Sequence, residues 1–108
     1  MTKPPNKELK DLVLTIIEDQ KALNIAIIDL SGKSDIADYV IIATGTSNRH
    51  LSSISDKVQR TLKKDKRKIL GVDGEDTGDW VVMDLEDVIV HLFRDEVREY
   101  YNIEELWD

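Results

Sequence analysis

The spacing of apolar positions along the chain predicts three helices. The first follows Pro5, because Asn6 is a typical capping residue and apolar side chains then recur with the i, i+3, i+4, i+7 spacing of one buried helical face. These side chains are Leu9, Leu12, Val13, Ile16 and Ile17. A second helix begins at Ser47 or Asn48 and runs to about Lys64. Its narrow apolar stripe consists of Leu51, Ile54, Val58 and Leu62. Asp95 is predicted to cap a short third helix over 96–101.

Short β-branched and apolar runs predict the strands. They lie at 25–30, 39–44, 69–72, 80–85 and 88–93. The first two are mostly apolar and are expected to be buried strands. Only Glu86 and Asp87 separate the last two, which favours an antiparallel hairpin because a parallel pair needs a long crossover. The sequence therefore predicts a mixed α/β (α+β) fold, with one mixed sheet of about five strands flanked by helices.

Length and composition predict a single domain. The chain has 108 residues, 41% of them hydrophobic and 34% charged, so one domain over 1–108 is expected, with 1–6 flexible. Every apolar run is far shorter than the roughly 20 residues that cross a bilayer, and no apolar leader is visible, so we expect a cytoplasmic protein. The absence of cysteine excludes disulfides, thiol nucleophiles and thiolate metal sites.

The formal charge of -7 argues against free binding to nucleic acid, since that affinity comes largely from lysine and arginine. A basic protein partner fits better, with little direct nucleic-acid binding. One feature runs the other way, a cationic run interrupted only by Asp65: Lys63, Lys64, Lys66, Arg67 and Lys68. Two readings of this run remain open, contact with phosphate or stabilisation of a helix C-terminus, and the second is favoured.

The sequence provides no convincing catalytic, cofactor or metal site. The segment 44–47 joins a strand to a helix, yet it matches no phosphate-binding loop, so a tight turn with a capping residue is the better interpretation. The acidic loop 73–79 lacks the spacing of an EF-hand. His50 and His91 are too few for a histidine-rich metal site, and His91 is expected to be a hydrogen-bonded structural residue.

The hairpin over 80–93 carries bulky apolar residues on both strand faces and has carboxylates nearby. In a strand, Trp80, Val82 and Asp84 share one face, while Val81 and Met83 share the other. One face has to pack on helices, so an aromatic or methionine on the other face would be partly exposed, a composition typical of interfaces. The alternative, a core hairpin covered by helices on both sides, is equally compatible with the pattern.

Long blocks of this chain resemble the ribosomal silencing factor (Iojap) family. The blocks are DYVIIATGTS at 38–47, preceded by DLS at 29–31 and followed by RH at 49–50, then GDWVVMDLEDVIVHLF at 78–93, REYY at 98–101 and LW at 106–107. The resemblance extends from about Leu9 to Trp107. It implies a fold similar to nucleotidyltransferases but without their catalytic residues.

The resemblance also implies a function: binding to the fourteenth protein of the large ribosomal subunit, steric blocking of association with the small subunit, and repression of translation when nutrients are limiting. A homodimer of the free protein is implied as well. Carried over to this chain, the docking surface centres on the hairpin, at Trp80, Met83, Asp84, Leu85 and Asp87. Two departures affect the turn, where Glu86 replaces a common glycine and Leu85 a frequent aromatic residue.

Two other classes of function remain as alternatives. A nucleotide-handling enzyme would bind nucleotide with magnesium, which calorimetry detects. A generic adaptor would recover a partner other than large ribosomal subunits in a pull-down.

Overall fold

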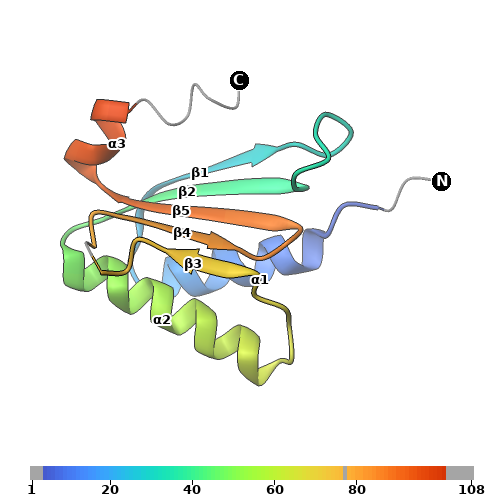
Figure 1. The fold of residues 1–108 in the computed structure, drawn as a ribbon, viewed down its shortest axis with the longest axis horizontal. Helices are drawn as coiled ribbons and strands as arrows, with labels where there is room; N and C mark the ends of the chain where they lie inside the picture. The colour runs from blue at the N-terminus through green and yellow to red at the C-terminus, as the bar shows by residue number, and fades with distance from the viewer. Residues whose placement is uncertain (1–3, 77, 102–108) are drawn as a thin grey trace.

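Five strands form one mixed sheet in a computed structural model that describes residues 4–76 and 78–101 (Figure 1). They are β1 (Leu23–Asp29), β2 (Tyr39–Gly45), β3 (Gly71–Asp73), β4 (Trp80–Asp84) and β5 (Val88–Arg94). Their order across the sheet is β1-β2-β5-β4-β3. Strands β2 and β5 are parallel, and the other neighbouring pairs are antiparallel. The mixed sheet and the antiparallel hairpin β4–β5 expected from the sequence are thus confirmed.

Three helices accompany the sheet: α1 (Lys7–Asp19), α2 (Asn48–Lys64) and α3 (Asp95–Tyr101). The predicted caps are confirmed, because the Asn6 side chain accepts a hydrogen bond from Leu9 N and the Ser47 hydroxyl accepts one from His50 N. Helix α3 includes Asp95, one position earlier than expected. The block LW at 106–107, which carries part of the family resemblance, lies outside the described residues. Within the described ranges, no helix has the length and apolar character needed to span a membrane.

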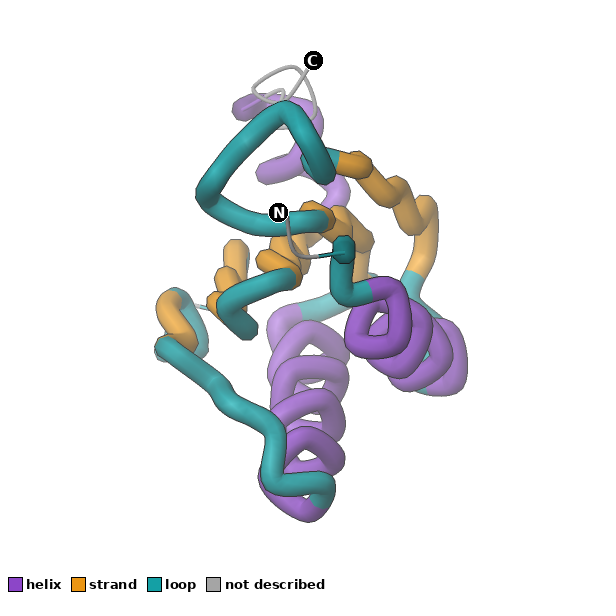
Figure 2. The backbone as a smooth tube through the Cα atoms, turned by 90° about the vertical axis from the view of Figure 1, so that its right-hand side faces the viewer, coloured by secondary structure: helices purple, strands orange, loops and turns teal. Residues whose placement is uncertain are grey.

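Helices α1 and α2 lie on one face of the sheet and α3 lies on the other (Figures 1 and 2). Between the sheet and the first two helices is the main core, to which α2 contributes its whole predicted stripe in fully buried form. Alternate side chains of the inner strands complete it: Tyr39, Ile41 and Ala43 from β2, Val81 and Met83 from β4, and Val88, Val90 and Leu92 from β5. The second face carries a smaller cluster around Val40, Ile42 and Phe93.

Strand β1 differs from the buried strand that its apolar run predicted. All seven residues of β2 are buried, whereas β1 lies at the sheet edge and leaves Leu23 47% and Ile27 45% exposed. The physical reason is that a short apolar run fits a central or an edge strand equally well, and only pairing decides which neighbours cover it. The pairing of β1 with β2 is also irregular, since the register shifts between Leu23 and Ala26 and Asn24 has a φ of 48°.

Asn6 joins three segments that are distant in sequence. Its backbone N–H donates to Asp38 Oδ2 at 2.8 Å, and its side-chain Nδ2 donates to Asp87 Oδ2 at 2.9 Å. The backbone oxygen of Asp87 in turn accepts hydrogen bonds from the N–H groups of Asp38 and Tyr39. The start of α1, the β1–β2 loop and the β4–β5 turn are therefore fixed to one another at one end of the sheet.

Replacing Asn6 should destabilise this junction. We expect Asn6→Ala to lower the free energy of unfolding by about 2 kcal/mol, because it removes both the helix cap and a hydrogen bond to a carboxylate. Urea denaturation at neutral pH measures the change. The matched variant Asn6→Ser keeps a capping hydroxyl but cannot reach Asp87, so it should lose about half as much; equal losses would assign the whole effect to the hydrogen bond with Asp87.

Candidate partner-binding surface

Strand alternation separates the side chains of the β4–β5 hairpin into a covered and an open face. Trp80, Val82 and Asp84 of β4 lie on the face away from α1 and α2, and all three are half-buried. Opposite Val82 in the register is His91, and opposite Asp84 is Ile89. We call these five residues the open hairpin face.

Trp80 is held in place by its neighbours on this face. Its ring centroid lies 4.8 Å from that of Phe93, and its indole Nε1 donates a hydrogen bond to His91 Nδ1 at 3.1 Å. His91 also stacks on Phe93, with an interplanar angle of 8° and 5.9 Å between ring centroids. A large aromatic side chain is thus presented in one orientation while part of its surface stays accessible, which is the arrangement that suits a binding anchor.

The five residues predicted for docking do not all reach the surface. Trp80 and Asp84 lie on the open hairpin face, but Met83 is 0% and Leu85 2% exposed, both in the main core. Asp87 is half-buried at the turn, where its carboxylate accepts the hydrogen bond from Asn6. In this conformation, Met83 and Leu85 support the hairpin from behind, because a side chain on the core face of a strand cannot also point outward.

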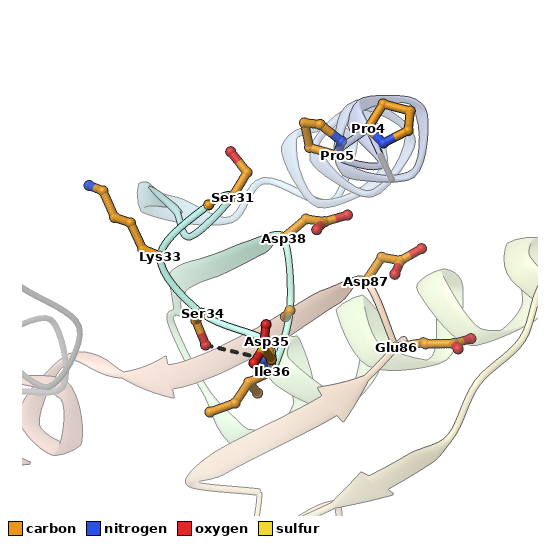
Figure 3. A pocket seen from close by; sticks show the side chains of 12 residues that line it. Pro4, Pro5, Ser31, Lys33, Ser34, Asp35, Ile36, Asp38, Glu86 and Asp87 are labelled. Atoms are coloured by element: carbon orange, nitrogen blue, oxygen red, sulfur yellow. Dashed lines mark hydrogen bonds between the residues drawn. The ribbon is translucent and has the colours of Figure 1, made fainter. Parts of the chain in front are cut away.

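Beyond Asp84 the hairpin continues into a hollow of about 890 Å³ between the β4–β5 turn and the loop that joins β1 to β2. Four carboxylates line it, which we call the acidic rim: Asp35, Asp38, Glu86 and Asp87. Figure 3 shows the carboxyl groups of Asp38, Glu86 and Asp87 pointing to the same side. Ile36, 64% exposed, also lines the hollow and adds an apolar contact to this end of the molecule.

The strand-to-helix segment at 44–47 forms the tight turn that the sequence favoured. Ser47 Oγ accepts from His50 N, and Thr46 N donates to His50 Nδ1 at 2.9 Å. A Cβ atom on Gly45 would come within 2.5 Å of Leu51 Cδ2, so any other residue here would force the buried Leu51 side chain to shift. Two of the N–H groups of this turn are thus satisfied by His50 and Ser47, and the glycine has a packing reason.

The histidines and the acidic loop have structural partners. Because Thr46 N donates to Nδ1 of His50, the proton of that ring is on Nε2, which lies 2.7 Å from the oxygen of Gln20. In the loop 73–79, Glu75 accepts hydrogen bonds from Gln59 and Ser55 on α2. Among the residues that the structure describes, no group of three or more potential metal ligands occurs.

Sequence reasoning did not name Val82, Ile89 or Ile36 as surface residues of the site, nor the buried His91 that orients Trp80. Val82 could have been found from its alternation with Trp80 and Asp84. Ile89 and His91 follow only once the hairpin register is known, since the register decides which residues of β5 lie opposite β4. For Ile36, nothing in the local pattern separates an exposed loop isoleucine from a core residue.

Comparison with known proteins identifies the family. The model of the family "Ribosomal silencing factor during starvation" matches residues 3–108. The chain belongs to the ribosomal silencing factor family. A ribosomal silencing factor of Zymomonas mobilis is 42% identical over 99 residues, which cover 92% of this chain and 74% of that protein. A mouse relative, named mitochondrial assembly of ribosomal large subunit protein 1, is 30% identical over 90% of this chain and 44% of its own length.

Solved structures agree with this membership of the ribosomal silencing factor family. A crystal structure of a Chromobacterium violaceum protein has a TM-score of 0.89 and 38% identity, and covers 94% of this chain and 84% of that chain. The family assignment makes this protein a regulatory factor of translation.

Glu86 occupies a strained position in the β4–β5 turn of this silencing factor. Its φ of 74° lies in the left-handed region, which costs a residue with a Cβ roughly 1–2 kcal/mol. We expect Glu86→Gly to raise the free energy of unfolding by about 0.5–1 kcal/mol, part of the relief being offset by the entropy of an unfolded glycine. Chemical denaturation measures this gain. Glu86→Ala removes the same charge but keeps the strain, so a similar gain in that variant would refute the explanation.

His91 should make stability depend on pH. Burial lowers the pKa of His91 to about 4, from 6.5. The unfolded chain therefore takes up a proton below pH 6.5 while the folded protein does not until about pH 4, so stability falls as the pH drops through this window. We expect native protein to lose about 2 kcal/mol more than His91→Gln between pH 7 and pH 5. Glutamine keeps an acceptor for Trp80 without titrating; equal pH profiles would exclude His91 as the cause.

Proposed function

We propose that this protein binds the large ribosomal subunit through the subunit's fourteenth protein and thereby blocks association with the small subunit, so that translation is repressed when nutrients are limiting. The observation that carries the proposal is the open hairpin face, where an oriented and half-buried Trp80 adjoins a rim of carboxylates. The name of the mouse relative, which refers to the large ribosomal subunit, supports the same partner. The proposed place of action is the cytoplasm.

The chemistry of the surface fits a basic protein partner. Ribosomal proteins lie among RNA phosphates and are accordingly rich in lysine and arginine. Of the acidic rim, Asp35 and Glu86 are exposed and make no ion pair within the described residues, so their charge is available to a partner. Such complementary charge speeds encounter, whereas apolar anchors supply most of the affinity. Trp80 and the apolar part of the open hairpin face are therefore the expected anchors, with Met83 and Leu85 holding the hairpin in shape from the core.

Steric occlusion is a sufficient mechanism for this silencing. The molecule measures 43 × 33 × 21 Å along its principal axes. Contacts between subunits require atoms within about 4 Å of one another, so a body about 20 Å thick on the joining surface prevents them without any chemical step. The apolar open hairpin face is also the proposed surface for the homodimer of the free protein, which subunit binding would then replace.

The test is sucrose-gradient sedimentation of purified ribosomal subunits, with and without this protein, under conditions in which the subunits join. Co-migration with the large subunit and loss of joined ribosomes are expected. A protein that stays at the top of the gradient while the subunits join normally would reject the proposed function and favour a generic adaptor.

Within the same assay, Trp80→Ala should weaken binding to the large subunit by at least about 1–2 kcal/mol, roughly tenfold or more, as expected for an aromatic anchor. The control is Leu23→Ala, which truncates an exposed apolar side chain on the far edge strand and should leave binding unchanged. Circular dichroism verifies that both variants are folded. Unchanged affinity of folded Trp80→Ala would remove Trp80 from the surface.

A further inference from the structure

Four lysines gather where α2 ends: Lys63, Lys64, Lys66 and Lys68, the lysine patch. All four are exposed, and within the described residues none of them makes an ion pair. Only Lys63 and Lys64 belong to the last turn of α2. Because the field of a helix terminus fades within one turn, stabilisation of the helix end does not account for Lys66 and Lys68.

The carboxylates next to the patch are already used by another cation. Asp65 Oδ2 lies 2.6 Å from Nε of Arg67, and Glu8 at the start of α1 pairs with the same guanidinium. Arg67 is thus the structural cation of the run and connects α2 to α1. The positive charge of the lysine patch is left without a counterpart in a protein whose net charge is -7.

The backbone at the patch forms a helix end with a left-handed residue. Lys66 N donates to the oxygen of Lys63 and Arg67 N to that of Leu62, the two hydrogen bonds of a Schellman helix end. In this motif the residue after the cap is left-handed and is usually glycine, yet here it is Lys66, with a φ of 56°. Helix α1 ends in the same way, with Lys21 at a φ of 66°, so the left-handed lysine is a feature of both helix ends and does not distinguish the patch.

The patch lies at the same end of the molecule as the acidic rim (Figure 1). Leu70 N, just beyond the patch, donates to the oxygen of Asp84 on the hairpin, and Asn6 connects the adjacent start of α1 to Asp87. One end of the protein therefore presents carboxylates from the hairpin turn and lysines from α2 in a fixed relation. A surface with both signs of charge matches a ribosomal surface, where basic protein and anionic RNA backbone lie side by side.

We propose that the lysine patch contacts backbone phosphates of ribosomal RNA next to the protein to which the hairpin docks, an inference that rests on the proposed function. Lysine suits this task as a compact charge that needs no particular base. With a net charge of -7, the protein gains this contact only when the hairpin already holds it on the subunit. The patch then adds affinity and fixes orientation, because two separated contacts prevent rotation about the hairpin.

The deciding experiment compares two targets, the whole large subunit and the isolated fourteenth ribosomal protein. The test variant is Lys63→Gln/Lys64→Gln/Lys66→Gln/Lys68→Gln. The matched control removes the same charge from four exposed and scattered cationic residues that do not line the hollow, by Lys7→Gln, Lys21→Gln, Arg49→Gln and Lys57→Gln together. A third variant with arginine at the four patch positions keeps the charge, and circular dichroism verifies folding of all three. Affinities are measured between 50 and 200 mM salt. Over this range the increase in salt lowers an affinity that includes two to four phosphate contacts by about 10- to 150-fold.

The expected result is selective. The test variant should bind the isolated protein like native protein, but bind the whole subunit at least tenfold more weakly at low salt and with a salt slope shallower by about 2–4. The control and arginine variants should retain the native slope. Equal binding of native and test variant to the subunit would overturn the proposal, as would weaker binding with an unchanged slope, which indicates a partner other than phosphate. Native protein that binds neither target would overturn the proposed function and this inference together.

Discussion

Burial of strand β2 on both of its faces is the constraint on which the rest of the structure depends. Its seven residues are all buried, so other parts of the chain have to pack against both faces of the sheet at this strand. Helices α1 and α2 cover one side with two full-length apolar stripes, whereas among the described residues the second side receives only the short α3 and the smaller cluster around Phe93. This imbalance leaves the β4–β5 hairpin covered from behind and open in front.

The open face of the hairpin then follows from the period of a strand. Since successive side chains point to opposite faces, the core fixes the outward positions as firmly as the inward ones. Because Met83 points into the core, Trp80 and Asp84 point to the opposite face of the strand. The contacts of Trp80 with Phe93 and His91 then fix the orientation of its indole ring. A binding surface on a strand is therefore as rigid as the core behind it, which reduces the entropy lost when a partner docks.

The elements were predictable because their signals are local. Asn6, Ser47 and the stripe of α2 indicate helices through capping and spacing alone, and the two-residue turn at Glu86 indicates the hairpin. Pairing is not local, which is why β1 was expected to be buried and proved to be an edge. The candidate site could likewise be predicted only in part. Strand alternation places Trp80 and Met83 on opposite faces, but the packing of the helices determines which of the two faces is buried. The family resemblance therefore included both Trp80 and Met83 among the docking residues, since it identifies a segment of the chain and not the direction in which each side chain points.

The irregular β1 edge has a consequence for solubility. An exposed strand with apolar side chains such as Leu23 and Ile27 is a template on which another chain can pair and extend the sheet. The shifted register and left-handed Asn24 interrupt the row of evenly spaced backbone groups there, and the opposite edge, β3, is only three residues long. Within the described strands, neither edge of the sheet offers a long regular template, which lowers the tendency of this sheet to grow by pairing with other chains.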